Sequence, residues 1–99
     1  MRVEWTELAI AQLDEAMAYI AADRPAAAIE WLELILHEAE RLAAFPDSGR
    51  VVPEAARDDI REIVVSPYRV VYRHDPDVVF VTMFLHERQN IESNDVVGG

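Results

Sequence analysis

The spacing of apolar residues changes about halfway along the 99 residues of this chain, and this change limits the folds that it can adopt. Up to residue 44, apolar side chains recur every three or four positions, as they do on one face of an α-helix. From residue 60 onward they alternate or form short β-branched runs, which is typical of strands. Residues 45–50, between the two patterns, are rich in turn-forming types. A helical half is therefore expected to precede a sheet-forming half.

Two amphipathic helices are expected in the first half. Thr6 is suited to cap the first helix, and Glu7 places a negative charge in its first turn. Asp23-Arg24-Pro25 ends this helix and begins the second, since proline is tolerated in a first turn. So short a break requires the helices to fold back as an antiparallel hairpin. Their apolar faces carry Ala9, Leu13, Ala16, Met17 and Ile20 in the first helix and Ala28, Trp31, Leu32, Ile35, Ala39 and Leu42 in the second.

Four strands are expected, one at residues 2–5 and three after the helices at 60–65, 68–73 and 78–85. The chain is therefore predicted to be α+β, with an N-terminal strand and an antiparallel helical hairpin packed on one face of an antiparallel sheet, in the order β-α-α-β-β-β. Residues 1–88 are expected to form a single domain and residues 89–99 a polar C-terminal tail. The side chains expected in the core are Trp31, Ile35, Leu42, Val70, Tyr72, Val79 and Val81.

Composition excludes several kinds of chemistry. The chain has no cysteine, and all nine basic residues are arginine, so neither a thiolate nor a lysine amine is available. A net charge of −10 repels phosphates, which argues against direct nucleic-acid binding and against an anionic membrane surface. His74-Asp75-Pro76-Asp77 has the chemistry of a turn, so neither a metal nor another cofactor is expected. Apolar runs of signal-peptide or membrane-span length are absent, and a cytoplasmic location is expected.

The arginines are spread unevenly along the chain. The first 49 residues carry a net charge of −7, whereas the remainder carries −3. Arg69 and Arg73 are predicted to share one strand face, and neighbouring strands are expected to bring Arg61 and Arg88 near them. Such a cluster fits an acidic segment of a partner protein, because arginine binds carboxylates in a bidentate manner. Pairing within the fold is equally open, and the carboxylates available for it are Glu54, Asp58, Asp59 and Glu62.

Three large apolar residues of the second predicted helix, Ile29, Leu34 and Leu36, fall outside its core face. Partial burial at the rim of the core is the simpler interpretation and the one that we favour. A partner-binding surface is the alternative, and it makes these residues candidates for apolar contacts.

The chain resembles the ParE/RelE toxin superfamily, and within it the ParE branch. The resemblance covers nearly the whole chain, and its pieces follow the order of the family at its usual spacings. These pieces are Trp5-Thr6 with Ala9 and Leu13, Tyr19-Ile20, Ala27-Ala28 with Trp31, Leu42 with Pro46, Gly49 and Arg50, Ile60-Arg61-Glu62, Tyr68-Arg69-Val70-Val71-Tyr72-Arg73, and His86 with Arg88.

The resemblance implies the toxin of a type II toxin–antitoxin system, held inactive in a hetero-oligomer with an antitoxin encoded by an adjacent gene. Members of the ParE branch are associated with inhibition of DNA gyrase, which makes gyrase the expected target. Members of the RelE branch are ribosome-dependent mRNA endonucleases. A toxin that has lost its activity and only binds antitoxin is a third possibility, because related folds host different functions.

Cleavage of RNA needs a base, an acid and cations that stabilise the charged transition state. The residues left for these roles in this chain are Glu62, Arg61, Arg69, Arg73, His86 and Arg88. The endoribonuclease hypothesis uses four of them, Arg61, Arg69, Arg73 and His86. RelE-like relatives use either lysine, arginine and tyrosine or glutamate, arginine and histidine. This chain has no lysine, and it has no tyrosine after His86, where the RNA-cleaving relatives tend to place one. We therefore predict a binding inhibitor without catalytic residues, and we keep the endoribonuclease as the alternative.

Overall fold

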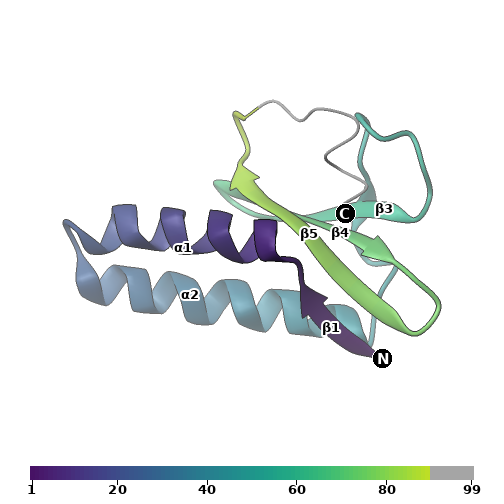
Figure 1. Ribbon diagram of the computed structural model, residues 1–99, viewed down its shortest axis with the longest axis horizontal. Coiled ribbons are helices and arrows are strands. Elements are labelled where there is room, and N and C mark those ends of the chain that lie inside the picture. Colours follow the sequence, from purple (N-terminus) through teal and green to yellow (C-terminus); the bar gives the residue numbers. More distant parts are fainter. Residues whose placement is uncertain (90–99) are drawn as a thin grey trace.

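The computed structural model describes residues 1–89, so residues 90–99, nearly all of the predicted polar tail, lie outside the described part. The chain forms β1 (Arg2–Trp5), α1 (Glu7–Ala21), α2 (Pro25–Glu40), a 3₁₀ turn (Arg41–Ala43), β2 (Arg50–Val51), β3 (Ile60–Val65), β4 (Tyr68–His74) and β5 (Val78–His86). Figure 1 shows the two helices side by side as a hairpin, with the strands forming a separate layer. The α+β class and the predicted order of the main elements are confirmed.

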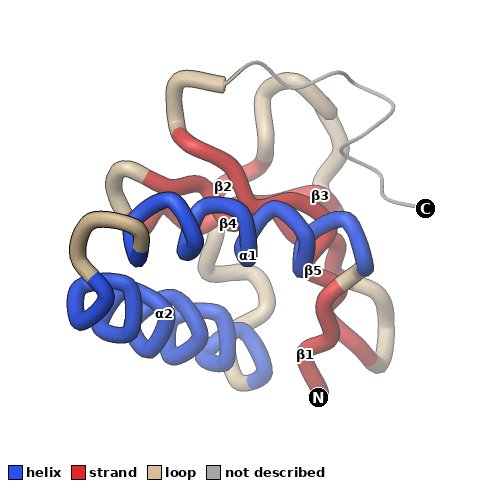
Figure 2. The backbone as a smooth tube through the Cα atoms, turned by 60° about the vertical axis from the view of Figure 1, so that its left-hand side comes forward, coloured by secondary structure: helices blue, strands red, loops and turns tan. Residues whose placement is uncertain are grey.

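The first helix begins where the sequence predicts, and its cap also joins it to the sheet. The Thr6 hydroxyl oxygen accepts a hydrogen bond from the Ala9 backbone N–H (3.2 Å) and donates one to the Thr82 carbonyl oxygen (3.3 Å). Thr82 belongs to β5, so the cap fixes the start of α1 against this strand. Figure 2 shows α1 lying across the strands, with α2 beside it.

The sheet is mixed rather than wholly antiparallel, which corrects one part of the prediction. The strand order is β1-β5-β4-β3-β2, and β1 runs parallel to β5. The hairpins β3–β4 and β4–β5 are antiparallel as expected. A tight turn forces antiparallel pairing, whereas β1 and β5 are separated by the whole helical hairpin and three other strands, so no turn fixes their relative direction. The edge strand β2 was not predicted, because its two residues follow directly on a turn sequence.

A bulge in β5 changes which side chains face the helices. Val71 lies opposite Met83 and Tyr72 lies opposite Val81, so Thr82 is an extra residue on β5. Val81 and Phe84 consequently both join the main core, although three positions separate them.

The main core lies between the sheet and the helices. Six of the seven predicted core residues are buried, namely Ile35, Leu42, Val70, Tyr72, Val79 and Val81. Trp31 is half-buried instead, and its ring meets that of Tyr68 edge-on. A smaller cluster of Val52, Ile60, Val71, Met83 and Leu85 lies on the other side of the sheet, because successive strand residues face opposite ways. Neither helix within residues 1–89 combines the length and apolar character needed to cross a membrane.

Candidate functional site

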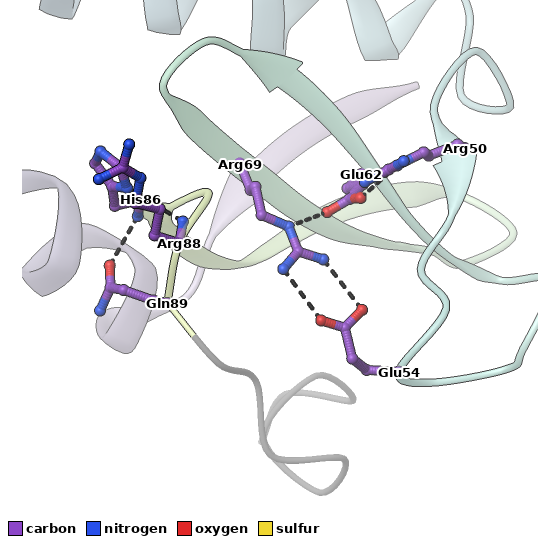
Figure 3. A network of polar contacts seen from close by, with 7 residues as sticks. All are labelled: Arg50, Glu54, Glu62, Arg69, His86, Arg88 and Gln89. Carbon is purple, nitrogen blue, oxygen red and sulfur yellow. Dashed lines mark hydrogen bonds and ion pairs between the residues drawn. The ribbon is translucent and has the colours of Figure 1, made fainter.

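The most extensive group of charged side chains lies on the sheet face opposite the helices and centres on Arg69 (Figure 3). Its Nε donates to Glu62 Oε1 (2.5 Å), and its two terminal nitrogens donate to the carboxylate of Glu54 at 3.1 and 3.2 Å. Arg50 Nε donates to the other oxygen of Glu62 at 2.6 Å. The Glu62 side chain is fully buried, and that of Arg69 is 7% exposed. Both arginines are therefore engaged within the fold.

Strand register explains this arrangement. Glu62 lies opposite Val71 and Arg69 lies opposite Val64, so the two charged side chains are diagonal neighbours on one face. The bidentate contact with Arg69 holds the pKa of the Glu54 carboxyl below its usual value, although partial burial opposes the shift. Burial alone would lower the pKa of Arg69, but its hydrogen bonds to Glu54 and Glu62 outweigh this and raise it. For Arg69, the structure thus favours pairing within the fold.

Arg61 does not join this cluster, contrary to the prediction. It lies opposite Tyr72, so its side chain starts from the helix-facing side of the sheet, whereas Arg69 and Arg73 face the other side. Its Nε donates to the Asp58 carbonyl oxygen (3.0 Å), and one terminal nitrogen donates to the Gly49 carbonyl oxygen (2.9 Å). Arg61 therefore ties two loops to β3.

Arg73 and His86 lie toward opposite ends of the central hairpin. Arg73 forms a bidentate contact with Asp75 (2.9 and 3.2 Å) and lies 5.2 Å from the centre of the Phe80 ring. His86 lies opposite Tyr68, five residues away from Arg73 along β4, a distance of about 16 Å at the usual rise per strand residue. The four residues considered for RNA cleavage, Arg61, Arg69, Arg73 and His86, therefore do not converge on one point.

His86 is held by its immediate neighbours, as Figure 3 shows. Its backbone N–H donates to Gln89 Oε1 (2.7 Å), and its ring Nδ1 accepts from the Arg88 backbone N–H (3.1 Å). The ring also meets that of Tyr68 edge-on. Arg88 is exposed, and within residues 1–89 its side chain forms no ion pair.

The apolar partner-binding candidates are exposed on α2. Ile29 is 60% exposed, Leu34 44% and Leu36 43%. Ile29 and Leu36 are seven residues apart, nearly two helical turns, and so share one flank of α2, whereas Leu34 lies on the opposite flank. These side chains form two separate apolar surfaces rather than one.

A pocket of about 270 Å³, which the sequence did not predict, lies between α1 and the paired ends of β4 and β5. One wall comes from a single face of α1, where Gln12, Glu15 and Tyr19 follow helical spacing. The opposite wall includes Tyr68, whose ring stacks on that of Phe84 at 5.0 Å. The helical spacing is visible in the sequence, but the register that places the second wall is not. Within residues 1–89, acidic and histidine side chains form no group of three or more that could hold a metal ion.

Comparison with known proteins gives one consistent result. Residues 3–91 match the family described as the ParE toxin of the parDE type II toxin–antitoxin system. The toxin-like protein Y4kP of Sinorhizobium fredii (strain NBRC 101917 / NGR234) is 38% identical over 90 residues, which cover 89% of this chain and 90% of the relative. A solved structure of a chromosomal ParDE system from P. aeruginosa has a TM-score of 0.73 at 18% identity, covering 87% of this chain and 95% of that one, and so shares the fold. The chain therefore belongs to the ParE toxin family of type II toxin–antitoxin systems.

Proposed function

We propose that this protein inhibits DNA gyrase by binding to it, without catalysis, and that a cognate antitoxin encoded by an adjacent gene neutralises it in a hetero-oligomeric complex in the cytoplasm. Family membership supports the toxin class. The observation that carries the non-catalytic mechanism is the separation of the four candidate nuclease residues. Arg69 and Arg73 are each held by internal carboxylates, and His86 lies about 16 Å along the hairpin from Arg73.

A ribonuclease requires these groups to act together. A general acid or base must come within hydrogen-bond reach of the proton that it transfers, and the cations must contact the same phosphate. Freeing Arg69 for a phosphate would leave Glu62, which is fully buried, with one of its two arginine partners removed. The net charge of −10 also repels ribosomal RNA.

The antitoxin contacts proposed here are mainly apolar. Ile29, Leu34 and Leu36 are large and exposed, and Arg88 adds an exposed cation near the end of β5. Arg61, Arg69 and Arg73 remain candidates for polar contacts with the antitoxin, and we rank them below the apolar residues because each is paired within the fold.

Two assays on one preparation test the mechanism. The purified protein is added to a gyrase supercoiling reaction and, separately, to ribosomes translating a defined mRNA. We expect loss of supercoiling and no mRNA cleavage. If neither activity appears while the antitoxin still binds, the protein is a toxin that has lost its activity, and the gyrase proposal fails.

A matched variant separates binding from catalysis. His86→Gln keeps side-chain hydrogen bonding but removes acid–base function, which contributes about 10²–10⁴ in rate when a residue provides it. We expect this variant to inhibit gyrase like the wild type, after its melting temperature has been checked. Ribosome-dependent cleavage by the wild type that disappears in a stably folded His86→Gln variant would establish the endoribonuclease instead.

A further inference from the structure

The pocket between α1 and the ends of β4 and β5 has walls rich in aromatic rings. Tyr68 and Phe84 stack with 28° between their planes, and His86 meets the Tyr68 ring edge-on at 6.1 Å. On the α1 side, Tyr19 is 84% exposed, more than any other large apolar side chain among the described residues. Aromatic ring faces carry partial negative charge and attract cations.

The charged lining of the pocket is also negative. Among the described residues, Glu15 is the only acidic side chain that lines it, and no arginine does. Glu15 forms no ion pair within residues 1–89, and it stands one helical turn before Tyr19 on the same face of α1. Among residues 1–89, therefore, one carboxylate without an ion pair and several aromatic rings line the pocket, and the nearest arginine in sequence, Arg88, is not part of its lining.

We propose that this pocket binds the guanidinium group of an arginine side chain presented by the antitoxin. The identity of the partner rests on the proposed function, whereas the preference for a guanidinium rests on the pocket itself. A guanidinium is flat and weakly hydrated, so it stacks on aromatic faces while its N–H groups pair with a carboxylate. A cavity of about 270 Å³ accommodates the end of one such side chain.

The preference for a guanidinium is tested on the protein alone with two small probes of nearly equal shape. Nα-acetyl-arginine N-methylamide carries the cation, and the corresponding citrulline derivative is neutral. Nitrogen-15 NMR follows the side-chain amides of Gln12 and Gln89 and the backbone amide of Phe84, all of which belong to pocket residues. We expect saturable shifts with the arginine probe and binding at least about threefold weaker with the citrulline probe. Equal binding of the two probes, or no saturable shift with arginine, would overturn the proposal.

A pair of variants assigns the binding to the carboxylate. Glu15→Gln keeps the size of the side chain and removes its charge, and Glu30→Gln makes the same change at an exposed position on α2. We expect weaker binding of the arginine probe only for Glu15→Gln. Unchanged binding in Glu15→Gln would show that the pocket does not recognise a cation in the proposed way.

The partner is tested in the complex with the antitoxin. Glu15→Arg places a cation at the pocket, and Asp77→Arg makes the same change of charge in the exposed turn before β5. We expect the affinity for the antitoxin to fall at least about tenfold for Glu15→Arg and to stay unchanged for Asp77→Arg. If the wild type binds the antitoxin and Glu15→Arg binds equally well, this inference fails while the proposed function stands. If the wild type does not bind the antitoxin, neutralisation fails, and so does the assignment of the arginine to that partner.

Discussion

The hydroxyl group of Tyr72 joins the loop after the helices to the centre of the sheet. It is fully buried, donates a hydrogen bond to the Pro46 carbonyl oxygen (2.6 Å) and accepts one from the Gly49 backbone N–H (3.0 Å). Gly49 has no room for a side chain, since a Cβ atom there would lie 2.6 Å from the Glu62 carbonyl oxygen. Both loop groups therefore depend on a single tyrosine oxygen.

Replacing Tyr72 with phenylalanine should lower the stability at neutral pH and should also reduce the further loss of stability at alkaline pH. At pH 7 the variant leaves two loop groups without their partner, so its free energy of unfolding should fall by about 1–3 kcal/mol. Burial raises the pKa of Tyr72 above its usual value, so the unfolded chain loses this proton first as the pH increases. The wild type should therefore lose stability as the pH rises beyond about 10, the ordinary tyrosine pKa, and the variant should lose less. Urea unfolding at both pH values measures this, and parallel pH profiles would contradict it.

The arginines illustrate what a sequence leaves undecided at the scale of single residues. The alternation that places Arg69 and Arg73 on one face was predicted correctly, and so was the supply of internal carboxylates. Whether Arg69 binds a partner protein or pairs with Glu62 depends on the register between β3 and β4. Sequence alternation alone does not fix this register, because pairings that are shifted by two residues place the same side chains on the same face. The same register sends Arg61 to the opposite face of the sheet.

At the level of single elements, α2 has a buried face and an exposed flank. Ile35 on its inner face has no exposure to solvent, whereas Ile29 on its flank is 60% exposed. The two residues have the same side chain, lie in the same helix and are six positions apart. Their comparison therefore isolates burial from helix propensity.

Truncation of these two isoleucines to alanine should have unequal effects on stability. Ile35→Ala removes fully buried methyl and methylene groups from the main core, so we expect a loss of about 2–5 kcal/mol in the free energy of unfolding. Ile29→Ala should change it by less than about 0.5 kcal/mol, because it is a surface substitution. Urea unfolding of both variants is the measurement. A loss below about 0.5 kcal/mol for Ile35→Ala would mean that the inner face of α2 is wrongly assigned.

The elements themselves were largely predictable because each has a strong local pattern. The helices have apolar faces, and the strands after residue 60 have alternation or β-branched runs. The pocket and the mixed sheet were not predictable, since both depend on pairings between distant segments. β1 finds its partner across the whole chain, and the bulge at Thr82 shifts the side chains of β5 without any glycine or proline to mark it.

At the scale of the whole molecule, charge and exposed apolar area concentrate in the same half. The first 49 residues carry a net charge of −7, and this part includes eight of the nine large apolar residues exposed in the described structure. An apolar patch bordered by charges is typical of a protein-binding surface. The helical hairpin is therefore the side on which we expect the antitoxin to make its apolar contacts.

The flank of α2 formed by Ile29 and Leu36 provides the test. Changing both residues to aspartate should weaken antitoxin binding at least about tenfold, because it removes apolar contacts and adds two charges to the interface. The control is Ile10→Asp, which changes an apolar side chain of α1 that is 47% exposed. Affinities from titration calorimetry, with melting temperatures checked first, give the comparison. Equal effects of the double variant and the control would exclude this flank as a specific contact.

The parallel pairing of β1 with β5 has a consequence for the synthesis of the protein. β5 lies between β1 and β4, and the cap of α1 donates to a carbonyl oxygen 76 residues later in the chain. During translation the first strand emerges early, but its only neighbour in the sheet is made after every other described element. A nascent chain that stops before β5 lacks the strand that joins the two parts of the sheet, and contacts so distant in sequence form slowly. A ribosome that stops before β5 therefore releases a chain that cannot form the complete sheet, and we expect such a chain to be inactive.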